Sequence, residues 1–260
     1  MNDNDTPVSK NEQLLTIHRA LNVLEYLSQA GRPVRLMEIS EAVGLPKSQI
    51  HRILSTLLSR NYVRQSPITR LYSLGFATWM LSRSMDYART LVDIARPVLD
   101  DLRSQTQETA FLSVLYGKSV LYLYTAMSPN PSHVYFQSGS QVPVHACASG
   151  KAMLAAQPRE YLDELFDNGL ERYTEYTITD KALLRQELDR IQQQGFAIED
   201  QEANPEMAAV AASLPISREN DLAGVGLFLP SVRLQEQTQE ALVARVITAR
   251  DQILHRLEGS

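Results

Sequence analysis

Apolar residues recur at helical spacing through the first sixty positions of the chain. In the first stretch they fall three or four residues apart, at Leu14, Ile17, Leu21, Leu24 and Leu27. This stripe predicts an amphipathic helix over residues 11–30, and Gly31 and Pro33 are residue types that commonly follow a helix end. Two shorter helices are expected over residues 36–43 and 45–60, because Gly44 interrupts the pattern between them.

Two strand-like runs come next, at residues 62–65 and 71–74, with turn-like residues 66–69 between them. This arrangement predicts a β-hairpin. Two helices, a tight turn, a third helix and a hairpin follow the order of a winged helix-turn-helix. We therefore expect a disordered tail at residues 1–10, a winged helix-turn-helix domain at residues 11–75 and a linking helix at residues 76–90.

Residues 91–260 combine strand-like and helical patterns. Strands are expected at residues 110–116, 119–124, 134–137, 196–199, 208–216 and 222–229, the last two being poor in charge. Helices are expected at residues 91–106, 149–156, 159–168, 180–194 and 232–257. A sheet with helices segregated on it is an α+β domain, which we expect to span residues 91–260.

Composition narrows the class of protein. Hydrophobic residues make up 44% of the 260 residues and charged residues 21%, as in an ordinary soluble chain. No run of eighteen apolar residues is present that could span a membrane, and residues 1–10 lack the apolar core of a signal peptide. The single cysteine, Cys147, excludes an internal disulfide and every cysteine-rich zinc site. These features predict a cytoplasmic protein.

The charge is divided unevenly along the chain. Residues 10–90 hold eleven basic and five acidic residues, a net charge of +6. Residues 91–260 hold fourteen basic and twenty-three acidic residues, a net charge of −9. A basic segment attracts a polyanion that an acidic segment repels. The split therefore favours double-stranded DNA as the partner of the N-terminal domain, in the cytoplasm and associated with the nucleoid.

The helix expected at residues 45–60 is the one that enters the major groove in a helix-turn-helix. If its apolar residues face inward, its exposed arc carries groups that can read base edges: Lys47, Ser48, Gln49, His51 and Arg52. Arg64 and Arg70 flank the wing turn, where phosphate or minor-groove contacts are expected, and Arg35 completes the DNA-binding set. The alternative for each residue is a solvated surface position without a partner.

Several segments, found in the same order, resemble the IclR family of bacterial transcription regulators from about Glu12 onward. In the first domain they are IHRALNVL at 17–24, ISEAVGLPKS at 39–48, RIL at 52–54 and YSLG at 72–75. In the second domain, PVHACASGKA at 143–152 is similar to the family signature PLHATASGKA, and GFAIEDQE at 195–202 is similar to GYAVDDEE. The resemblance implies that the second domain is GAF-like and binds a small effector, often a carboxylate or aromatic metabolite.

The resemblance also implies six effector-binding positions. Ala148 and Ser149 take the place of main-chain ligand contacts, Glu199 that of an acidic residue, Ala209 that of a frequent cysteine, and Gly226 and Phe228 those of two serines in small-carboxylate binders. The lost hydroxyls and thiol and the added phenyl ring favour a bulkier ligand, such as an aromatic or apolar carboxylate. Alternatively, Ala209, Gly226 and Phe228 are only core residues of their strands, and Ser149-Gly150-Lys151 is only the cap and first turn of a helix. A helix start is compatible with effector binding, because its free N–H groups attract anions.

The resemblance further implies repression more often than activation, and dimers that pair into tetramers through the second domain. A dimer also follows physically, because two half-sites multiply specificity. The linking segment supplies apolar residues suited to a dimer contact: Phe76, Trp79, Met80 and Leu81. We expect effector binding to favour one arrangement of the two winged helices and so to change operator affinity.

Catalytic and cofactor motifs are missing. Gly150 and Lys151 lack the upstream glycine and the following Ser or Thr of a phosphate loop, and Ser149 has no lysine three residues later. The histidines show no metal-binding spacing: His18, His51, His133, His145 and His255. Cys147 is expected to be a buried, small apolar residue. We expect no enzyme, no cofactor and no metal; the alternative is a GAF-fold enzyme or metabolite-binding protein with an accessory DNA-binding module.

Overall fold

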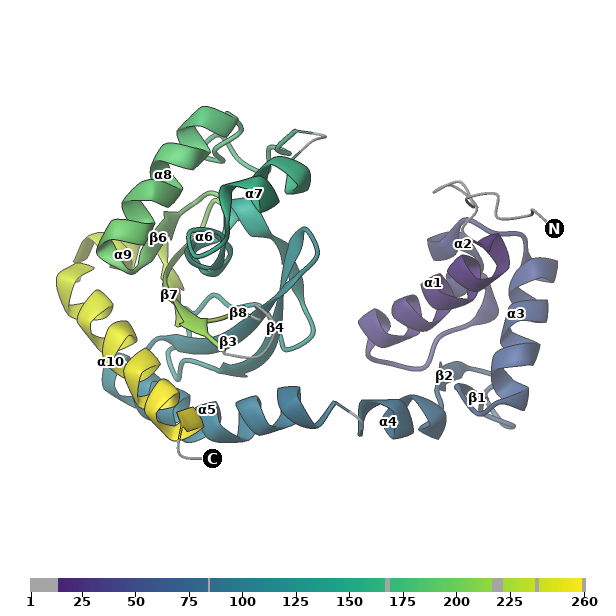
Figure 1. Ribbon diagram of the computed structural model, residues 1–260. Helices are drawn as coiled ribbons and strands as arrows, with labels where there is room; N and C mark the ends of the chain where they lie inside the picture. The colour runs from purple at the N-terminus through teal and green to yellow at the C-terminus, as the bar shows by residue number, and fades with distance from the viewer. Residues whose placement is uncertain (1–13, 84, 167–168, 217–221, 237–238, 259–260) are drawn as a thin grey trace, which may run out of the picture. The chain divides into compact units, whose positions relative to one another are not determined.

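The computed structural model of the protein (Figure 1) describes residues 14–83, 85–166, 169–216, 222–236 and 239–258. Contacts within the chain divide it into two compact units, Met1–Asp86 and Tyr87–Ser260. The tail expected at residues 1–10 lies outside the described residues. None of the described helices has both the length and the apolar composition needed to cross a membrane.

The first unit is a helix-turn-helix followed by a small hairpin. Helices α1 (Leu15–Ala30), α2 (Leu36–Val43) and α3 (Lys47–Ser59) precede strand β1 (Val63–Gln65) and its antiparallel partner β2 (Tyr72–Leu74). Side chains from these elements and the segment before α2 meet in one core: Val23, Leu27, Val34, Ile39, Ile50, Leu54, Leu57, Val63 and Tyr72. The predicted winged helix-turn-helix is confirmed.

Helix α1 buries only the second half of its apolar stripe. Val23 and Leu27 are buried, whereas Leu14, Ile17 and Leu21 are 71%, 55% and 49% exposed. The apolar stripe of α1 is longer than the surface of α2, α3 and the hairpin against which it packs. The spacing of apolar residues alone does not show which part of a stripe has a packing partner. The first half of α1 therefore has an apolar surface that the described residues of the first unit leave uncovered.

The linking helix predicted at residues 76–90 is wrong in its extent. The structure has a short helix, α4 (Phe76–Ser82), and a separate helix, α5 (Asp86–Thr106). Helix α5 buries Leu91 and Leu99 in the core of the second unit, and one more turn at the start of a packed helix adds hydrogen bonds at little entropic cost. Apolar spacing continues through both helices, so it did not locate the break between Ser82 and Asp86.

The second unit contains a six-stranded antiparallel sheet in the order β5-β4-β3-β8-β7-β6. Its strands are β3 (Thr109–Tyr116), β4 (Ser119–Ala126), β5 (Gln141–Pro143), β6 (Ala197–Asp200), β7 (Met207–Pro215) and β8 (Leu222–Pro230). The predicted hairpin of β3 and β4 is confirmed, as are the interior positions of the charge-poor strands β7 and β8. The α+β fold class is likewise confirmed.

One predicted strand is wrong. Residues 134–137 form no strand, and the short strand that pairs with β4 is β5. Val134, Tyr135 and Phe136 lie in a loop and pack half-buried against the core of this unit. Their apolar character therefore reflects burial and not pairing with another strand.

Helices cover both faces of the sheet. On one face lie α5 and α10 (Gln239–Glu258), side by side in Figure 1, over an apolar core. On the other face lie the 3-10 helix η1 (Val144–Ala146), α6 (Ala148–Leu154) and α8 (Lys181–Gln194), with α7 (Arg159–Leu165) packed beside them. The short helix α9 (Ser231–Glu236) follows β8. The predicted effector-binding residues all belong to the second face, which we call the α6 face.

Candidate DNA interface and effector site

A tight turn sets the direction of α3. Gly44 ends α2 with a φ of +69°, a left-handed conformation that favours glycine. The hydroxyl of Ser40 donates to the carbonyl of Leu45 at 2.6 Å, and the amide of Leu45 donates to the carbonyl of Ser40 at 3.2 Å. Pro46 precedes the first turn of α3, where a missing N–H costs little. These contacts fix the angle between the two helices.

The two faces of α3 separate as the helical spacing predicts. Its buried residues are Ile50, Leu54 and Leu57. The residues predicted to contact DNA are exposed, except for the half-buried Gln49: Lys47, Ser48, Gln49, His51 and Arg52. Within the described residues, no acidic side chain pairs with Lys47 or Arg52. Both cations are therefore available to a phosphate or a base edge.

The wing places two further predicted residues at the surface. Arg64 on β1 is exposed, and its Nε donates to Oγ of Ser73 on β2 at 2.9 Å. Arg70 is exposed in the turn with a φ of +59°. Arg35 is exposed directly before α2, where its amide donates to the carboxylate of Glu38 at 2.9 Å.

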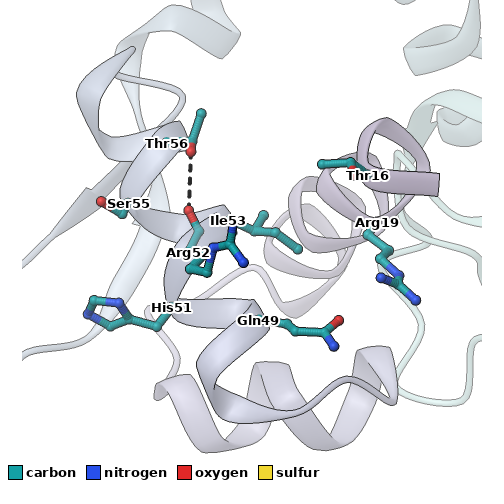
Figure 2. A pocket seen from close by; sticks show the side chains of 8 residues that line it. All are labelled: Thr16, Arg19, Gln49, His51, Arg52, Ile53, Ser55 and Thr56. Carbon is teal, nitrogen blue, oxygen red and sulfur yellow. Dashed lines mark hydrogen bonds between the residues drawn. The ribbon is translucent and has the colours of Figure 1, made fainter. Parts of the chain in front are cut away.

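A groove beside α3 adds a residue that the sequence analysis did not select. Arg19 of α1 lines a pocket of about 520 Å³ together with Gln49 and Arg52 of α3. Figure 2 shows these three side chains. Arg19 stands four residues before the buried Val23, which is a core-facing position on the helix. An arginine at such a position is the signal that could have identified it.

Three predicted effector residues from three strands meet in one row of the sheet. The register pairs Glu199 on β6 with Ala209 on β7, and Ala209 with Phe228 on β8. All three side chains are buried. The methyl group of Ala209 thus separates the carboxyl group of Glu199 from the ring of Phe228.

Gly226 lies where a side chain would not fit. A Cβ atom there would stand 2.2 Å from the carbonyl oxygen of Val210 and 2.7 Å from the ring of Phe111. The Phe111 ring stacks on Phe228 with a centroid distance of 4.3 Å. Close packing against Phe111 and Val210 therefore accounts for Gly226, which favours the core interpretation of this position.

Ala148 and Ser149 begin α6, which approaches both η1 and the sheet closely. A Cβ atom at Gly150 would stand 2.0 Å from the carbonyl oxygen of Val144, so only glycine allows this approach. The Oγ atoms of Ser149 and Ser113 on β3 are 2.5 Å apart. The side chain of Ser149 therefore links α6 to the sheet, and its main chain is what it can offer a ligand.

Four aromatic rings form a cluster on the α6 face, which we call the aromatic cluster: Phe111, Tyr122, Phe136 and Phe228. Phe228 meets Tyr122 edge-on with centroids 5.2 Å apart and Phe136 edge-on at 5.5 Å. Phe136 stacks on Tyr122 at 5.6 Å with an interplanar angle of 11°. Sequence analysis selected only Phe228, because the other rings reach the cluster from β3, β4 and a loop.

A buried group of charged side chains lies near Glu199, in the row that it forms with Ala209 and Phe228. The lysine of this group, Lys151, was not among the predicted site residues. Lys151 on α6 is 1% exposed. Its Nζ lies 2.5 Å from Oε1 of Glu202, 3.3 Å from the carbonyl of Ile198 and 3.9 Å from Glu187. Burial raises the pKa of Glu202, although the attraction of Lys151 opposes the rise. Lys151 is thus surrounded by acceptors from β6, α8 and the loop after β6.

Glu199 is buried beside these charges, and one of its two carboxyl oxygens accepts hydrogen bonds. Its Oε1 accepts the amides of Glu202 at 2.7 Å and Ala203 at 3.2 Å. Its Oε2 has no hydrogen-bond partner within the described residues. Burial raises the pKa of Glu199 to about 8, and the charge of Glu202 adds to the rise. At neutral pH the carboxyl group is therefore largely protonated.

Tyr122 and Cys147 lie near Glu199. The hydroxyl of Tyr122 is buried, and the group that it faces is the thiol of Cys147, a weak hydrogen-bonding group. Burial raises the pKa of Tyr122, and the neighbouring Cys147 and Glu199 raise it further. Burial also raises the pKa of Cys147 to about 12, so Cys147 is the buried and unreactive thiol that was expected.

The remaining polar residue of the signature segment has a packing role. His145 is buried, and its Nε2 lies 2.9 Å from the carbonyl oxygen of Glu171. Burial lowers the pKa of its imidazole. In the described ranges, no three His, Cys, Asp or Glu side chains are grouped so that they could hold a metal ion.

Comparison with known proteins identifies both units. The family model of the IclR helix-turn-helix domain matches residues 16–67, and that of the bacterial transcriptional regulator IclR C-terminal domain matches residues 87–255. The HTH-type transcriptional regulator BhcR of Paracoccus denitrificans is 31% identical over 234 residues, which cover 90% of this chain and 84% of that protein. The transcriptional repressor IclR of Escherichia coli is 25% identical over 244 residues, 93% and 89% of the two chains.

A similar fold is known from crystal structures. One is that of an IclR homolog from Microbacterium hydrocarbonoxydans complexed with 4-hydroxybenzoate. It matches with a TM-score of 0.80 at 23% identity and covers 94% of this chain and 100% of that chain.

Proposed function

The protein belongs to the IclR family of bacterial transcriptional regulators, and from this premise we propose that its first unit binds an operator while its second unit binds a small effector. The observation that carries the first half is the exposed basic face of α3, whose Lys47 and Arg52 pair with no acidic side chain among the described residues. Its relatives are regulators, so the alternative of an enzyme with an accessory DNA-binding module is set aside.

For the DNA-binding domain, at residues 11–75, we propose two kinds of contact. Lys47, Ser48, Gln49, His51 and Arg52 read base edges from α3. Arg35, Arg64 and Arg70 contact the backbone or the minor groove, and Arg19 joins them because it shares the groove with Arg52. Phosphate contacts hold the protein in position, and the α3 contacts select the sequence.

The apolar surfaces of the first unit support a homodimer. Phe76, Trp79, Met80 and Leu81 on α4 are 78%, 60%, 68% and 58% exposed. The first half of α1 is also exposed and apolar. A dimer would remove both surfaces from water and present two copies of α3 to a two-part operator. Pairing of dimers into tetramers, through residues 91–260, remains part of the proposal.

For the effector, we propose an aromatic or otherwise apolar small molecule, bound on the α6 face. Glu199, Ala209 and Phe228 adjoin the aromatic cluster, which matches a flat ring better than a two-carbon acid. The main chain at Ala148 and Ser149 borders the same layer. The relative that was crystallised with 4-hydroxybenzoate shows that a ligand of this class fits this fold in another protein.

Regulation follows if the effector has different affinities for two arrangements of the dimer. The linking segment at residues 76–90 would carry the change from the effector domain to the winged helices. We propose that the protein acts as a repressor in the cytoplasm, at the nucleoid, because its relatives include the repressor of Escherichia coli.

The DNA interface is tested with Arg52→Ala on an operator selected by the full-length protein from random duplexes. If Arg52 reads a guanine, the variant should lose roughly 1–3 kcal/mol of discrimination between the operator and a mutated site. Arg64→Ala is the matched control, because loss of a phosphate contact should weaken binding to all duplexes and reduce the salt slope by about one. Unchanged operator preference in Arg52→Ala would show that α3 is not the reading helix.

A further inference from the structure

We propose that residues 127–139 form a strap over the aromatic cluster, latched by the ion pair of Arg233 and Glu108, and that a ligand reaches the cluster when this strap lifts. The strap belongs to the proposed effector site, on which the inference rests, and it supplies the way into that site. Arg233 and Glu108 are positioning residues in this account, because they hold the strap and touch no ligand themselves.

The latch joins three segments of the second unit. Arg233 on α9 binds both carboxylate oxygens of Glu108: Nε donates to Oε1 at 2.7 Å and Nη2 donates to Oε2 at 2.8 Å. Its Nη1 donates to the carbonyl of Ser132 in the strap at 2.8 Å. The side chain of Glu108 is only 1% exposed, so water competes little for these charge-assisted bonds. Since Glu108 stands between α5 and β3, the latch ties the strap to the end of α5.

Both ends of the strap are fixed by further hydrogen bonds. Near its start, Oγ of Ser128 donates to the carbonyl of Gln107 at 2.6 Å, and Nδ2 of Asn130 donates to the same carbonyl at 2.9 Å. At its other end, the amide of Gly139 donates to the carbonyl of Tyr122 on β4 at 2.7 Å. Any movement of the strap is therefore concentrated between these two attachments.

The middle of the strap, residues 133–138, is held mainly by apolar contacts. Among the described residues, its hydrogen bonds run only to positions two or three residues away along the chain. Val134, Tyr135 and Phe136 are half-buried against the core of the α6 face. A segment with few hydrogen bonds to its surroundings and partly exposed side chains opens more easily than the sheet beneath it. The contact between Arg233 and the strap therefore has a large share in keeping this stretch closed.

Access to the aromatic cluster requires such a movement. Phe111, Tyr122 and Phe228 are at most 1% exposed, and they belong to the strands β3, β4 and β8. Phe136 is half-buried, stacks on Tyr122 and meets Phe228 edge-on, so it forms the outer side of the cluster. When the strap lifts, Phe136 leaves while the other three rings stay on the sheet. A ligand ring can then take up contacts with them before the strap closes again.

The latch is tested by removing it without leaving a buried charge. Glu108→Gln combined with Arg233→Met replaces both partners by neutral side chains, which avoids the cost of one unpaired buried ion. In the full-length protein, Val134→Cys adds a thiol to the strap, and its rate of labelling by methyl methanethiosulfonate reports lifting without any ligand. We expect at least about tenfold faster labelling when the latch is removed, because the charge-assisted bonds of Arg233 are lost. Mass spectrometry of peptides separates this thiol from Cys147.

The binding kinetics of a ligand test whether the strap is the way in. Surface plasmon resonance would follow 4-hydroxybenzoate on the unmodified protein and on the protein without the latch. A latch that stabilises the closed strap equally with and without ligand slows entry and exit alike. Its removal should therefore raise the association and dissociation rate constants by the same factor, about tenfold, and leave Kd unchanged. A merely structural role would instead raise Kd.

A matched control removes an ion pair on the opposite face of the same sheet. Arg250→Met with Asp251→Asn on α10 should leave strap labelling and ligand kinetics as they are in the unmodified protein. Equal labelling with and without the latch would overturn the inference, as would unchanged rate constants or a raised Kd. Failure of 4-hydroxybenzoate to bind either protein would contradict the proposed effector class and the entry of such a ligand under the strap, while the labelling rates decide the latch independently.

Discussion

Single residues on the α6 face show how close packing and buried charge share one small volume. At Gly226 and Gly150 the backbone of a neighbouring element lies so close that a Cβ atom would clash with it. Lys151, Glu199 and Glu202 are buried in the same unit as the aromatic cluster. Because the structure shows what each of these residues contacts, the effect of a single substitution on stability can be predicted for each.

At Gly226, replacement by alanine should destabilise the second unit. The added methyl group would meet the backbone of Val210 and the ring of Phe111, and overpacking of this kind costs about 1–3 kcal/mol. Urea unfolding followed by circular dichroism would measure the loss as a lower midpoint. An unchanged midpoint would mean that the sheet adjusts to a side chain at this position.

Glu199 should make stability depend on pH. Its pKa is about 8 in the folded protein and near the ordinary value of 4.5 in the unfolded chain, because burial disfavours the charged form. The contribution of Glu199 to the free energy of unfolding is therefore fully present below about pH 4.5 and is lost as the pH rises towards 8.

Substitution of Glu199 by glutamine tests this dependence. The decline in unfolding free energy between pH 5 and 8 should become shallower, by at most about 1.4 kcal/mol per pH unit for one proton. Part of the decline should remain, since burial also raises the pKa of Glu202. Parallel curves for the two proteins, from denaturant titrations at several pH values, would show that Glu199 is ionised in the folded state.

At the scale of elements, α1 and α4 are amphipathic helices whose apolar faces the first unit does not fully cover. Core contacts hold the second half of α1, while its first half is exposed. All described side chains of α4 are exposed or half-buried. Helices of this kind are stabilised by packing against another surface, which is why we assign them to the dimer contact.

Replacement of Trp79 by serine should therefore weaken the dimer. The indole on α4 is 60% exposed within one chain and would be buried in the proposed contact. Analytical ultracentrifugation across a concentration series would detect a shift towards the monomer. Ile68→Ser is the control, because Ile68 is 90% exposed at the wing and lies outside the proposed contact. Equal association of both variants would argue against α4 as the dimer contact.

At the scale of the whole molecule, a basic unit and an acidic unit are joined in one chain. The charge split favours the first unit as the one that binds the polyanion, and the proposed effector site lies in the second unit. If binding of one ligand changes the affinity for the other, the two effects must be equal by thermodynamic linkage.

Reciprocal titrations would check this coupling. The factor by which a bound effector changes operator affinity should equal the factor by which saturating operator changes effector affinity. Fluorescence anisotropy would give the first factor and calorimetry the second, with 4-hydroxybenzoate as the first probe. A mutated duplex that the protein does not select serves as the control. An effect in only one direction would mean that the two measurements report different sites.

The sequence by itself determined most of the elements, the order of the two units and the family. Helical spacing, glycine breaks and strand alternation depend on neighbours along the chain, and those signals located α1 to α3, the wing and most of the large sheet. Charge counting indicated DNA for the first unit. Matching motifs indicated Glu199, Ala209 and Phe228, although these residues stand far apart in the sequence.

Only the tertiary structure decided what those residues meet. The register of β6, β7 and β8 placed Glu199, Ala209 and Phe228 in one row, and it showed that Phe111 fills the space over Gly226. Arg19 became a functional candidate because it shares a groove with Arg52 of α3, and only the structure showed that Lys151 and Tyr122 are buried near Glu199. The break before α5 and the loop at residues 134–137 were missed for the same reason: apolar spacing reports that a residue is buried, while the surface against which it packs is decided by elements from elsewhere in the chain.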